Sequence, residues 1–260
     1  MFVKKSLGQN FLIDKNIIKK IVNLVDLKNK NIIEIGPGTG SLTEEILIKK
    51  PKSLYLIEKD KHLFDKLNKK YDGNKIIKIF NFDILRFDLE KIIKKNTVIL
   101  GNLPYNISSQ ILVKILKLKL WPPNFHSLVF MFQKELADKI SGKYASKNYG
   151  RLSILTNYRL KIKDKFLVSP NCFFPKPKVI SQVIHFQPKK MIPIKLKSVG
   201  NLEKITNTLF SNKRKMINKN IKKILNEADL KKIFNLKLNL RPAEISPNIY
   251  YKITELFEKK

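Results

Sequence analysis

Short apolar runs alternate with stretches of helical spacing over the first two thirds of the chain. In the stretches between the runs, apolar residues recur every three or four positions, as on one face of an amphipathic helix. Parallel strands need such crossover helices, so the alternation predicts an open α/β sheet. The runs that read as strands cover residues 31–35, 53–57, 76–80, 98–100 and 126–132.

The pattern also predicts where helices begin. Asp14 reads as the N-cap of an amphipathic helix over residues 17–25. Ser41 and Glu44 have the S-x-x-E spacing of a capping box, so a second helix is expected to start at Ser41. Further helices are predicted over residues 107–118 and 133–141.

The last third of the chain changes character. Residues 161–168 read as a strand, and residues 179–186 alternate well enough to close the sheet as an antiparallel edge. The prolines and charges of residues 187–193 then break the strand pattern, and helical spacing returns at 202–210, 216–225 and 249–257. We therefore predict an α/β domain over residues 1–187 and a small helical domain over residues 188–260.

The charge narrows the range of partners. Lys and Arg number 53 against 21 Asp and Glu, which leaves a formal net charge of +32 and suits a polyanion such as nucleic acid. A basic ridge in the predicted helical domain would bind phosphates; it comprises Lys213, Arg214, Lys215, Lys219, Lys222 and Lys223. The chain is also crowded with Lys, Ile and Asn, as expected of a genome drifting towards A and T, so drift remains an alternative source of some lysines.

Several classes of protein are disfavoured. No apolar run approaches the roughly 18 residues of a membrane span, and the amino terminus lacks the apolar core of a secretory signal. The single cysteine, Cys172, fits a reducing compartment, so we expect a cytoplasmic protein with no membrane partner. His62, His126 and His185 are scattered along the chain without a Cys or carboxylate at ligand spacing, so no metal site is expected.

Polar residues stand where successive predicted strands end. Glu34 precedes a glycine loop, Gly36-Pro37-Gly38-Thr39-Gly40, whose backbone would let a ligand come close at the start of a helix. Glu58, 22 positions after Gly36, is placed to accept from both hydroxyls of a ribose. Asp83 could accept from an adenine amino group.

The turn Asn102-Leu103-Pro104-Tyr105 completes this set. An Asn amide, a rigid proline and an aromatic ring in one small volume suit the exocyclic amino group of a nucleobase, although a helix-capping turn with a buried Tyr has the same composition. The stiff loop 169–178 could present Phe173 or Phe174 opposite Tyr105, and a ring merely packed against the sheet is the alternative.

Five segments in this order resemble the small-subunit ribosomal RNA adenine N6,N6-dimethyltransferase family over nearly all 260 residues. They are K-x-x-G-Q-N-F-L at the start, E-I-G-P-G-x-G, N-L-P-Y-N-I-S, Y-G-R-L-S and P-x-x-F-x-P-x-P-K-V. The resemblance implies a class I (Rossmann-like) methyltransferase sheet with a small carboxyl-terminal helical domain. It implies S-adenosylmethionine as cofactor, bound by Asn10, Leu12, Gly36, Glu58, Asp83 and Asn102. It also implies that Tyr105 and Phe173 sandwich the target adenine beside Asn102, Leu103 and Pro104.

The implied activity is dimethylation of two adjacent adenines near the 3′ end of 16S rRNA, within the 30S subunit or its precursor, by a monomer. The related large-subunit methylases of macrolide resistance share the Q-N-F-L start and the N-x-P-Y turn, but residues 209–215 and 240–246 resemble segments of the small-subunit enzymes. A non-catalytic assembly factor on the same fold is a second alternative. A nicotinamide dehydrogenase is disfavoured by the glycine spacing, G-x-G-x-G.

Overall fold

The computed structural model describes residues 8–259 of the chain, which form two compact units. The first unit takes the chain as far as Lys114, together with Pro122–Ala137 and Ile162–Pro188. The second takes Ile115–Trp121, Asp138–Lys161 and the chain from Lys189 onward. Two earlier segments thus join the carboxyl-terminal helices, and the simple division at residues 187 and 188 stays a prediction.

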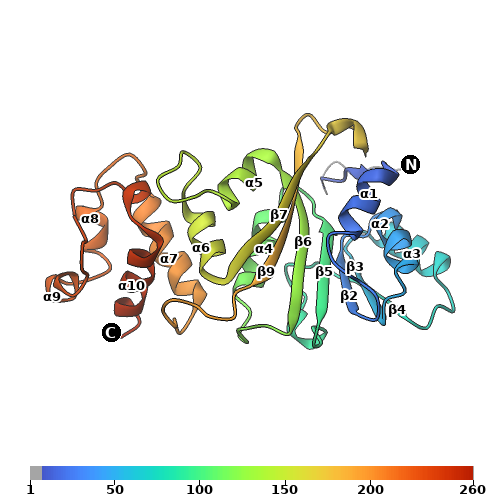
Figure 1. Cartoon of the computed structure of the whole chain (residues 1–260), viewed down its shortest axis with the longest axis horizontal. Helices are drawn as coiled ribbons and strands as arrows, with labels where there is room; N and C mark the ends of the chain where they lie inside the picture. Colours follow the sequence, from blue (N-terminus) through green and yellow to red (C-terminus); the bar gives the residue numbers. More distant parts are fainter. Residues whose placement is uncertain (1–7, 260) are drawn as a thin grey trace. The chain divides into compact units, whose positions relative to one another are not determined.

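A seven-stranded sheet runs through the first unit in the order β4-β3-β2-β5-β6-β9-β7 (Figure 1). The strands β4, β3, β2, β5 and β6 are mutually parallel, whereas β9 runs antiparallel to β6. Their bounds are β2 Asn31–Ile35, β3 Ser53–Glu58, β4 Ile77–Asn81, β5 Thr97–Asn102, β6 Phe125–Gln133, β7 Leu160–Val168 and β9 Ser181–Pro188. The open, mainly parallel α/β sheet predicted from the sequence is therefore present.

The edge of the sheet is not the strand that the sequence predicted. The segment predicted as the antiparallel edge is β9, which is antiparallel but lies between β6 and β7 and is buried along most of its length. The edge strand on this side of the sheet is β7, and its exposed Lys161, Lys163 and Lys165 are typical of edge strands, where charge prevents pairing with another chain. The alternation of apolar and polar residues predicts a strand, but it contains no information about the order of strands in the sheet.

Helices connect the strands of the first unit and extend beyond it. They are α1 Lys15–Val22, α2 Ser41–Ile48, α3 Lys61–Lys70, α4 Ser108–Leu116 and α5 Lys134–Ile140. Asp14 caps α1 as predicted, since its carboxylate accepts from the backbone N–H groups of Asn16 and Ile17. The capping box at Ser41 is wrong: the N-cap of α2 is Gly40, at φ +85°, and no side chain caps the helix. Glu44 instead forms an ion pair with Lys70.

The core of the first unit explains the continuous apolar runs of the central strands. Helices α1 and α2 pack together, and their residues Ile21, Val22 and Ile46 join one buried cluster with strand residues such as Ile32 and Val98. The next residues along these strands, including Ile33 and Ile99, are also fully buried. Both faces of the central strands are therefore covered, as parallel sheets require.

The second unit is helical, and the hydroxyls of buried tyrosines link its segments by hydrogen bonds. It contains α6 Arg151–Arg159, α7 Val199–Phe210, α8 Asn218–Ile221, α9 Glu227–Lys231 and α10 Pro247–Phe257. The hydroxyls of Tyr149, Tyr250 and Tyr251 donate to the carbonyls of Ile245, Pro242 and Ile154 at 2.8–3.2 Å. Each hydroxyl is buried with a partner, so these tyrosines add apolar contact without an unsatisfied polar group.

The helix expected over residues 216–225 is much shorter than its apolar pattern suggested. Only Asn218–Ile221 is an α-helix, although Ile217, Ile221, Ile224 and Leu225 are all buried. The apolar spacing therefore identified the buried side chains correctly, but not the length of regular helix that carries them.

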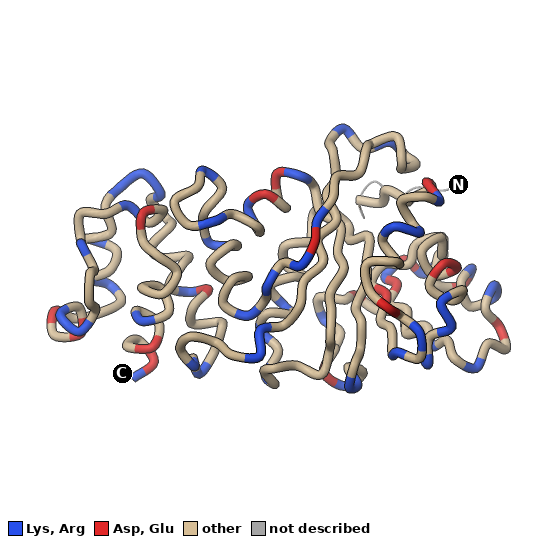
Figure 2. Tube along the Cα trace, viewed as in Figure 1, with Lys and Arg blue, Asp and Glu red and all other residues tan. Residues whose placement is uncertain are grey.

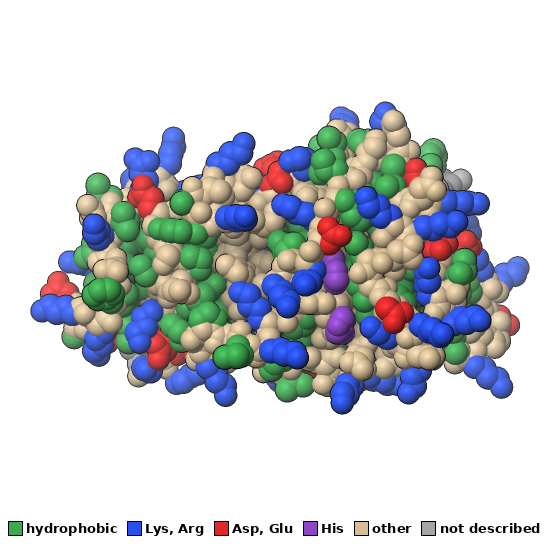
Figure 3. Space-filling model, in the orientation of Figure 1, with side chains coloured by type: hydrophobic (Ala, Val, Ile, Leu, Met, Phe, Trp, Pro, Cys, Tyr) green, Lys and Arg blue, Asp and Glu red, His purple; other side chains and the backbone are tan. Residues whose placement is uncertain are grey.

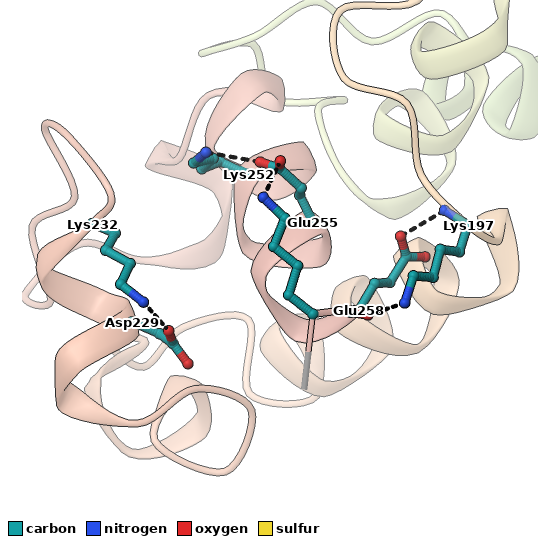
Figure 4. Close-up of polar contacts among 7 residues, drawn as sticks. Lys197, Asp229, Lys232, Lys252, Glu255 and Glu258 are labelled. Atoms are coloured by element: carbon teal, nitrogen blue, oxygen red, sulfur yellow. Dashed lines mark hydrogen bonds and ion pairs between the residues drawn. The ribbon is translucent and has the colours of Figure 1, made fainter.

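Many carboxylates of the second unit lie close to lysines. The carboxylate of Glu255 lies 2.8 Å from both Lys252 Nζ and Lys259 Nζ, and Asp229 lies 2.9 Å from Lys232 Nζ (Figure 4). The hydrogen bonds from Lys252 and Lys259 lower the pKa of Glu255. Within residues 8–259, no helix is long and apolar enough to cross a bilayer.

Candidate active site

A cavity opens at the carboxyl ends of β2, β3 and β5 in the first unit. Its empty volume, counting the open solvent at its mouth, is about 1130 Å³. All the residues predicted to contact a cofactor line it, as does the whole predicted tetrapeptide; they are Asn10, Leu12, Gly36, Glu58, Asp83, Asn102, Leu103, Pro104 and Tyr105. The strand ends thus meet at one edge because the strands are parallel and adjacent.

The glycine loop after β2 needs its glycines. Gly36, Gly38 and Gly40 all have positive φ, between +60° and +85°, a region that side chains other than glycine rarely enter. A Cβ on Gly38 would also lie 3.0 Å from the ring of Phe11. The loop can therefore bring its backbone against the cavity only with these residues.

The side chain of Glu58 accepts hydrogen bonds that hold this loop in place. Its Oε2 accepts from the backbone N–H of Gly38 at 3.1 Å and its Oε1 from that of Asp60 at 2.8 Å. Burial raises the pKa of Glu58, and the two backbone hydrogen bonds partly offset that rise. Each carboxylate oxygen has accepted one bond and can accept a second from a ligand hydroxyl.

Asp83 lies at the neighbouring end of the cavity, after β4. Burial raises the pKa of Asp83, but the hydrogen bond from Lys59 Nζ at 2.9 Å and the backbone N–H of Leu85 outweigh it and leave the pKa lowered. Asp83 is therefore an ionised acceptor at neutral pH. Phe82, half exposed beside it, also lines the cavity, a position that the strand pattern did not single out.

The amide of Asn102 is oriented by the chain itself. Its Nδ2 donates to the backbone carbonyl of Asn10 at 2.8 Å. This bond assigns Oδ1 to the other side of the amide, and no described residue donates to that oxygen or to the carbonyl of Leu103. Two acceptors that no described residue occupies thus belong to adjacent residues of the cavity lining, as a group with two N–H bonds would require.

The segment that carries Asn10 is itself fixed over the cavity. Gln9 Nε2 donates to Asp60 Oδ2 at 3.1 Å, and β1 Phe11–Leu12 pairs antiparallel with β8 Phe173–Phe174. No local pattern in the sequence predicts these contacts of Gln9 and Asn10, because their partners are 51 and 92 residues away. The first part of the K-x-x-G-Q-N-F-L motif, residues 5–7, lies outside the described residues.

The two aromatic candidates opposite Tyr105 differ in burial. Phe173 is 3% exposed and packs in the core, whereas Phe174 is 50% exposed, and neither lines the cavity. Tyr105 is half-buried, and its hydroxyl lies 2.5 Å from Ser181 Oγ. The structure therefore brings Tyr105 together with Asn102, but it does not bring either phenylalanine into the same lining.

Glu34 occupies the base of the site. It is fully buried, accepts from Thr43 Oγ1 at 2.6 Å and has its pKa raised to about 8, chiefly by burial. A carboxyl group in this state is protonated at neutral pH and acts as a neutral hydrogen-bonding group below the glycine loop.

The fold is shared with solved RNA methyltransferases. A crystal structure of a dimethyladenosine transferase from Plasmodium falciparum is 24% identical, with a TM-score of 0.72 over 94% of this chain and 95% of that one. The 23S rRNA methyltransferase ErmE gives a TM-score of 0.69 at 22% identity, over 95% and 99% of the two chains. The sheet is that of a class I methyltransferase, and the fold class predicted from the sequence is confirmed.

Sequence relatives define the family more closely. The family described as ribosomal RNA adenine dimethylase matches residues 2–259. A protein from Pelagibacter ubique named ribosomal RNA small subunit methyltransferase A is 46% identical, over 99% of this chain and 98% of its own length. A protein of the same name from Malacoplasma penetrans is 40% identical, over 97% and 91%. The chain belongs to the ribosomal RNA adenine dimethylase family, which confirms the resemblance seen in its motifs.

The buried Glu34 predicts a pH-dependent stability. Between pH 4.5 and about 8 this carboxyl is protonated in the folded protein and ionised in the unfolded chain. The unfolded chain then binds fewer protons, so the free energy of unfolding should fall as pH rises through this window, by at most about 1.4 kcal/mol per pH unit. Glu34→Gln cannot ionise and should lose this slope, gaining stability relative to the parent from pH 5 to 8.

Urea denaturation at several pH values measures this difference. The control is Glu44→Gln, an exposed carboxylate on α2, which should change the slope much less. A constant stability difference between Glu34→Gln and the parent across pH 5 to 8 would contradict the assignment of a protonated Glu34.

Proposed function

We propose that this chain transfers methyl groups from S-adenosylmethionine to N6 of two adjacent adenines near the 3′ end of 16S rRNA, giving N6,N6-dimethyladenines during assembly of the small subunit. The observation that carries the proposal is the oriented amide of Asn102 in a cavity lined by a glycine loop and strand-end carboxylates. The small-subunit rRNA is supported by the names of the relatives at 46% and 40% identity. We expect the enzyme to act as a monomer in the cytoplasm on the 30S subunit or its precursor.

The lining of the cavity fits the proposed cofactor by its chemistry. Glu58 keeps acceptor capacity for a pair of ribose hydroxyls, Asp83 for an adenine amino group, and the backbone of Gly36 and Gly38 allows close approach. Asn10, Leu12 and Asn102 complete the predicted cofactor set from the other wall of the cavity. When bound, S-adenosylmethionine supplies the methyl: an N–C bond forms at N6, the sulfonium C–S bond breaks, and N6 loses a proton.

The protein's task is to prepare a weak nucleophile. The lone pair of adenine N6 is delocalised into the ring, so the amine must be held in a geometry that localises it. Asn102 Oδ1 and the Leu103 carbonyl accept its two N–H bonds, while Pro104 fixes the turn and Tyr105 offers a face for the extruded base. No Ser, Cys or His is required to attack. After the first transfer only one N–H remains, so the second transfer gives up one of these bonds and must accommodate a methyl group.

The proposed role of Phe173 requires a conformational change. A ring that is 3% exposed in the core can stack on a base only if β8 moves, whereas Phe174 beside it is already exposed. We keep Phe173 as the proposed partner of Tyr105 on the strength of the motif that it occupies, with Phe174 as the alternative. Adenine methylation by Phe173→Ala and Phe174→Ala variants distinguishes the two rings.

The basic ridge is proposed as an rRNA contact. All six of its residues are exposed, and of these only Lys222 lies near a carboxylate among the described residues, 3.6 Å from Glu227. Figure 2 shows the run of basic residues on the loop after α7. Lys and Arg side chains are scattered over the whole face seen in Figure 3, so positive charge alone does not locate the RNA.

Asn102→Ala tests the chemistry. We expect turnover to fall roughly 100-fold or more, because a preorganised acceptor is removed from the reacting amine, while the fold and most of the affinity for the cofactor remain. Asn106→Ala, in the same turn and also lining the cavity, is the matched control. Methyl transfer from labelled cofactor to undermethylated 30S particles is the measurement. Near-normal turnover by Asn102→Ala would contradict the mechanism.

Glu58→Ala tests the cofactor site. Ribose contacts are largely the same in the ground and transition states, so affinity for S-adenosylmethionine should weaken far more than the rate of the chemical step at saturating cofactor. Calorimetry gives the affinity and single-turnover kinetics give the rate. Asp65→Ala, an exposed carboxylate on α3, should leave both unchanged. Unchanged affinity in Glu58→Ala would remove Glu58 from the site.

The double change Arg214→Ala and Lys215→Ala separates RNA recognition from compositional drift. If both residues contact phosphates, the slope of log affinity for 30S particles against log salt should shrink by about 0.7 to 0.9 per lost contact, with cofactor affinity unchanged. The matched control removes two exposed lysines of α3, Lys66 and Lys69. Binding to nonspecific duplex should fall equally in both variants. Equal losses on 30S particles would place recognition elsewhere.

A further inference from the structure

The hydroxyl of Tyr105 has a partner that the mechanism does not use. It lies 2.5 Å from Oγ of Ser181, 76 residues further along the chain. At this separation the two hydroxyls are hydrogen-bonded, whichever oxygen donates. Ser181 is fully buried and does not line the cavity, so it can touch neither the base nor the cofactor.

Ser181 is held in the sheet. It is the first residue of β9 and pairs with Gln133 at the end of β6. Just before it, the carbonyl of Ile180 accepts from the backbone N–H of Lys134 at 2.9 Å. Because Ser181 is buried and paired with β6, its hydroxyl is held in the sheet rather than on a mobile surface group.

The main chain of Tyr105 is fixed separately. Its carbonyl accepts from Ser108 Oγ at 3.1 Å, and the carbonyl of Pro104 accepts from the N–H of Ile107 at 3.2 Å. Only two rotatable bonds, χ1 and χ2, separate this backbone from the plane of the ring. Holding the hydroxyl at one end and the backbone at the other therefore restricts both the position and the tilt of the ring.

We propose that Ser181 is a positioning residue, whose hydroxyl sets the orientation of the Tyr105 ring against which the target adenine stacks. The inference rests on the proposed role of Tyr105 in base binding. A ring ordered before the base arrives need not be immobilised during binding, so the adenine meets Asn102 Oδ1 in one orientation. The partner of the bond is a neutral hydroxyl, which places no charge beside the reacting amine.

Ser181→Ala and Tyr105→Phe each remove the hydrogen bond and keep the ring. Each should lower kcat for methylation of undermethylated 30S particles by roughly 2- to 12-fold, the equivalent of one neutral hydrogen bond. Affinity for S-adenosylmethionine, measured by calorimetry, should not change. The double variant should be no slower than either single variant, because both remove the same interaction.

Ser127→Ala is the matched control. Ser127 is also a fully buried serine of the same sheet, but its hydroxyl lies 2.9 Å from His126 Nδ1 and 3.1 Å from His185 Nε2, neither of which lines the cavity. Its substitution can lower the melting temperature but should leave kcat unchanged. If Ser181 has a merely structural role, Ser181→Ala will behave in the same way, with a lower melting temperature and the kcat of the parent, and the proposal is overturned.

Two further outcomes are decisive. Independent, multiplicative losses in the double variant would show that the two hydroxyls do not act through one bond, and would overturn the inference. Should Ser181→Ala fail to fold, Tyr105→Phe alone decides, since a parent-like kcat in that variant excludes a role for the bond. Tyr105→Ala separates this inference from the proposed function: full activity there refutes the role of the ring, whereas lost activity with a normal Ser181→Ala refutes only Ser181.

Discussion

One buried carboxylate ties the parts of the cofactor cavity together. Glu58, at the end of β3, accepts from the backbone of the glycine loop after β2 and from the backbone that begins α3. Its partners are main-chain groups, so the loop and the helix are held by one carboxyl group whose hydrogen bonds do not depend on other side chains. The same carboxylate has capacity left for a ligand, and therefore the group that builds the cavity is also placed to recognise what enters it.

The amino-terminal segment joins the two halves of the proposed reaction. Asn10 lines the cavity and orients the amide of Asn102, while the next two residues form β1 and pair with β8 of the loop that carries Phe173 and Phe174. One short stretch therefore touches the cofactor side, the proposed catalytic acceptor and the proposed base-binding loop. A disturbance of this segment is expected to reach all three, because its backbone makes the bond to Asn102 and the pairing with β8, and Asn10 lines the cavity.

The basic side chains differ in whether a carboxylate lies beside them, and the net charge does not show this difference. On α10 and at Asp229, carboxylates are paired with neighbouring lysines, whereas the exposed basic residues from Lys213 to Lys215 have no carboxylate partner among the described residues. A lysine already paired with a carboxylate attracts a phosphate less strongly. The ridge after α7 is therefore a better candidate for RNA than the net charge of +32 by itself would indicate.

The sequence alone determined the class of fold and the polar strand-end residues of the cavity lining, because both follow from local patterns. A polar residue after an apolar run must lie at a strand end, and parallel strands bring their ends to one edge, which is why Glu58, Asp83 and Asn102 were found without a structure. Only the tertiary structure decided what depends on distant partners: that β9 is interior, that Phe173 is in the core and that Ser181 meets Tyr105. Strand order, burial and contacts across 76 residues arise from packing, and no local periodicity records them.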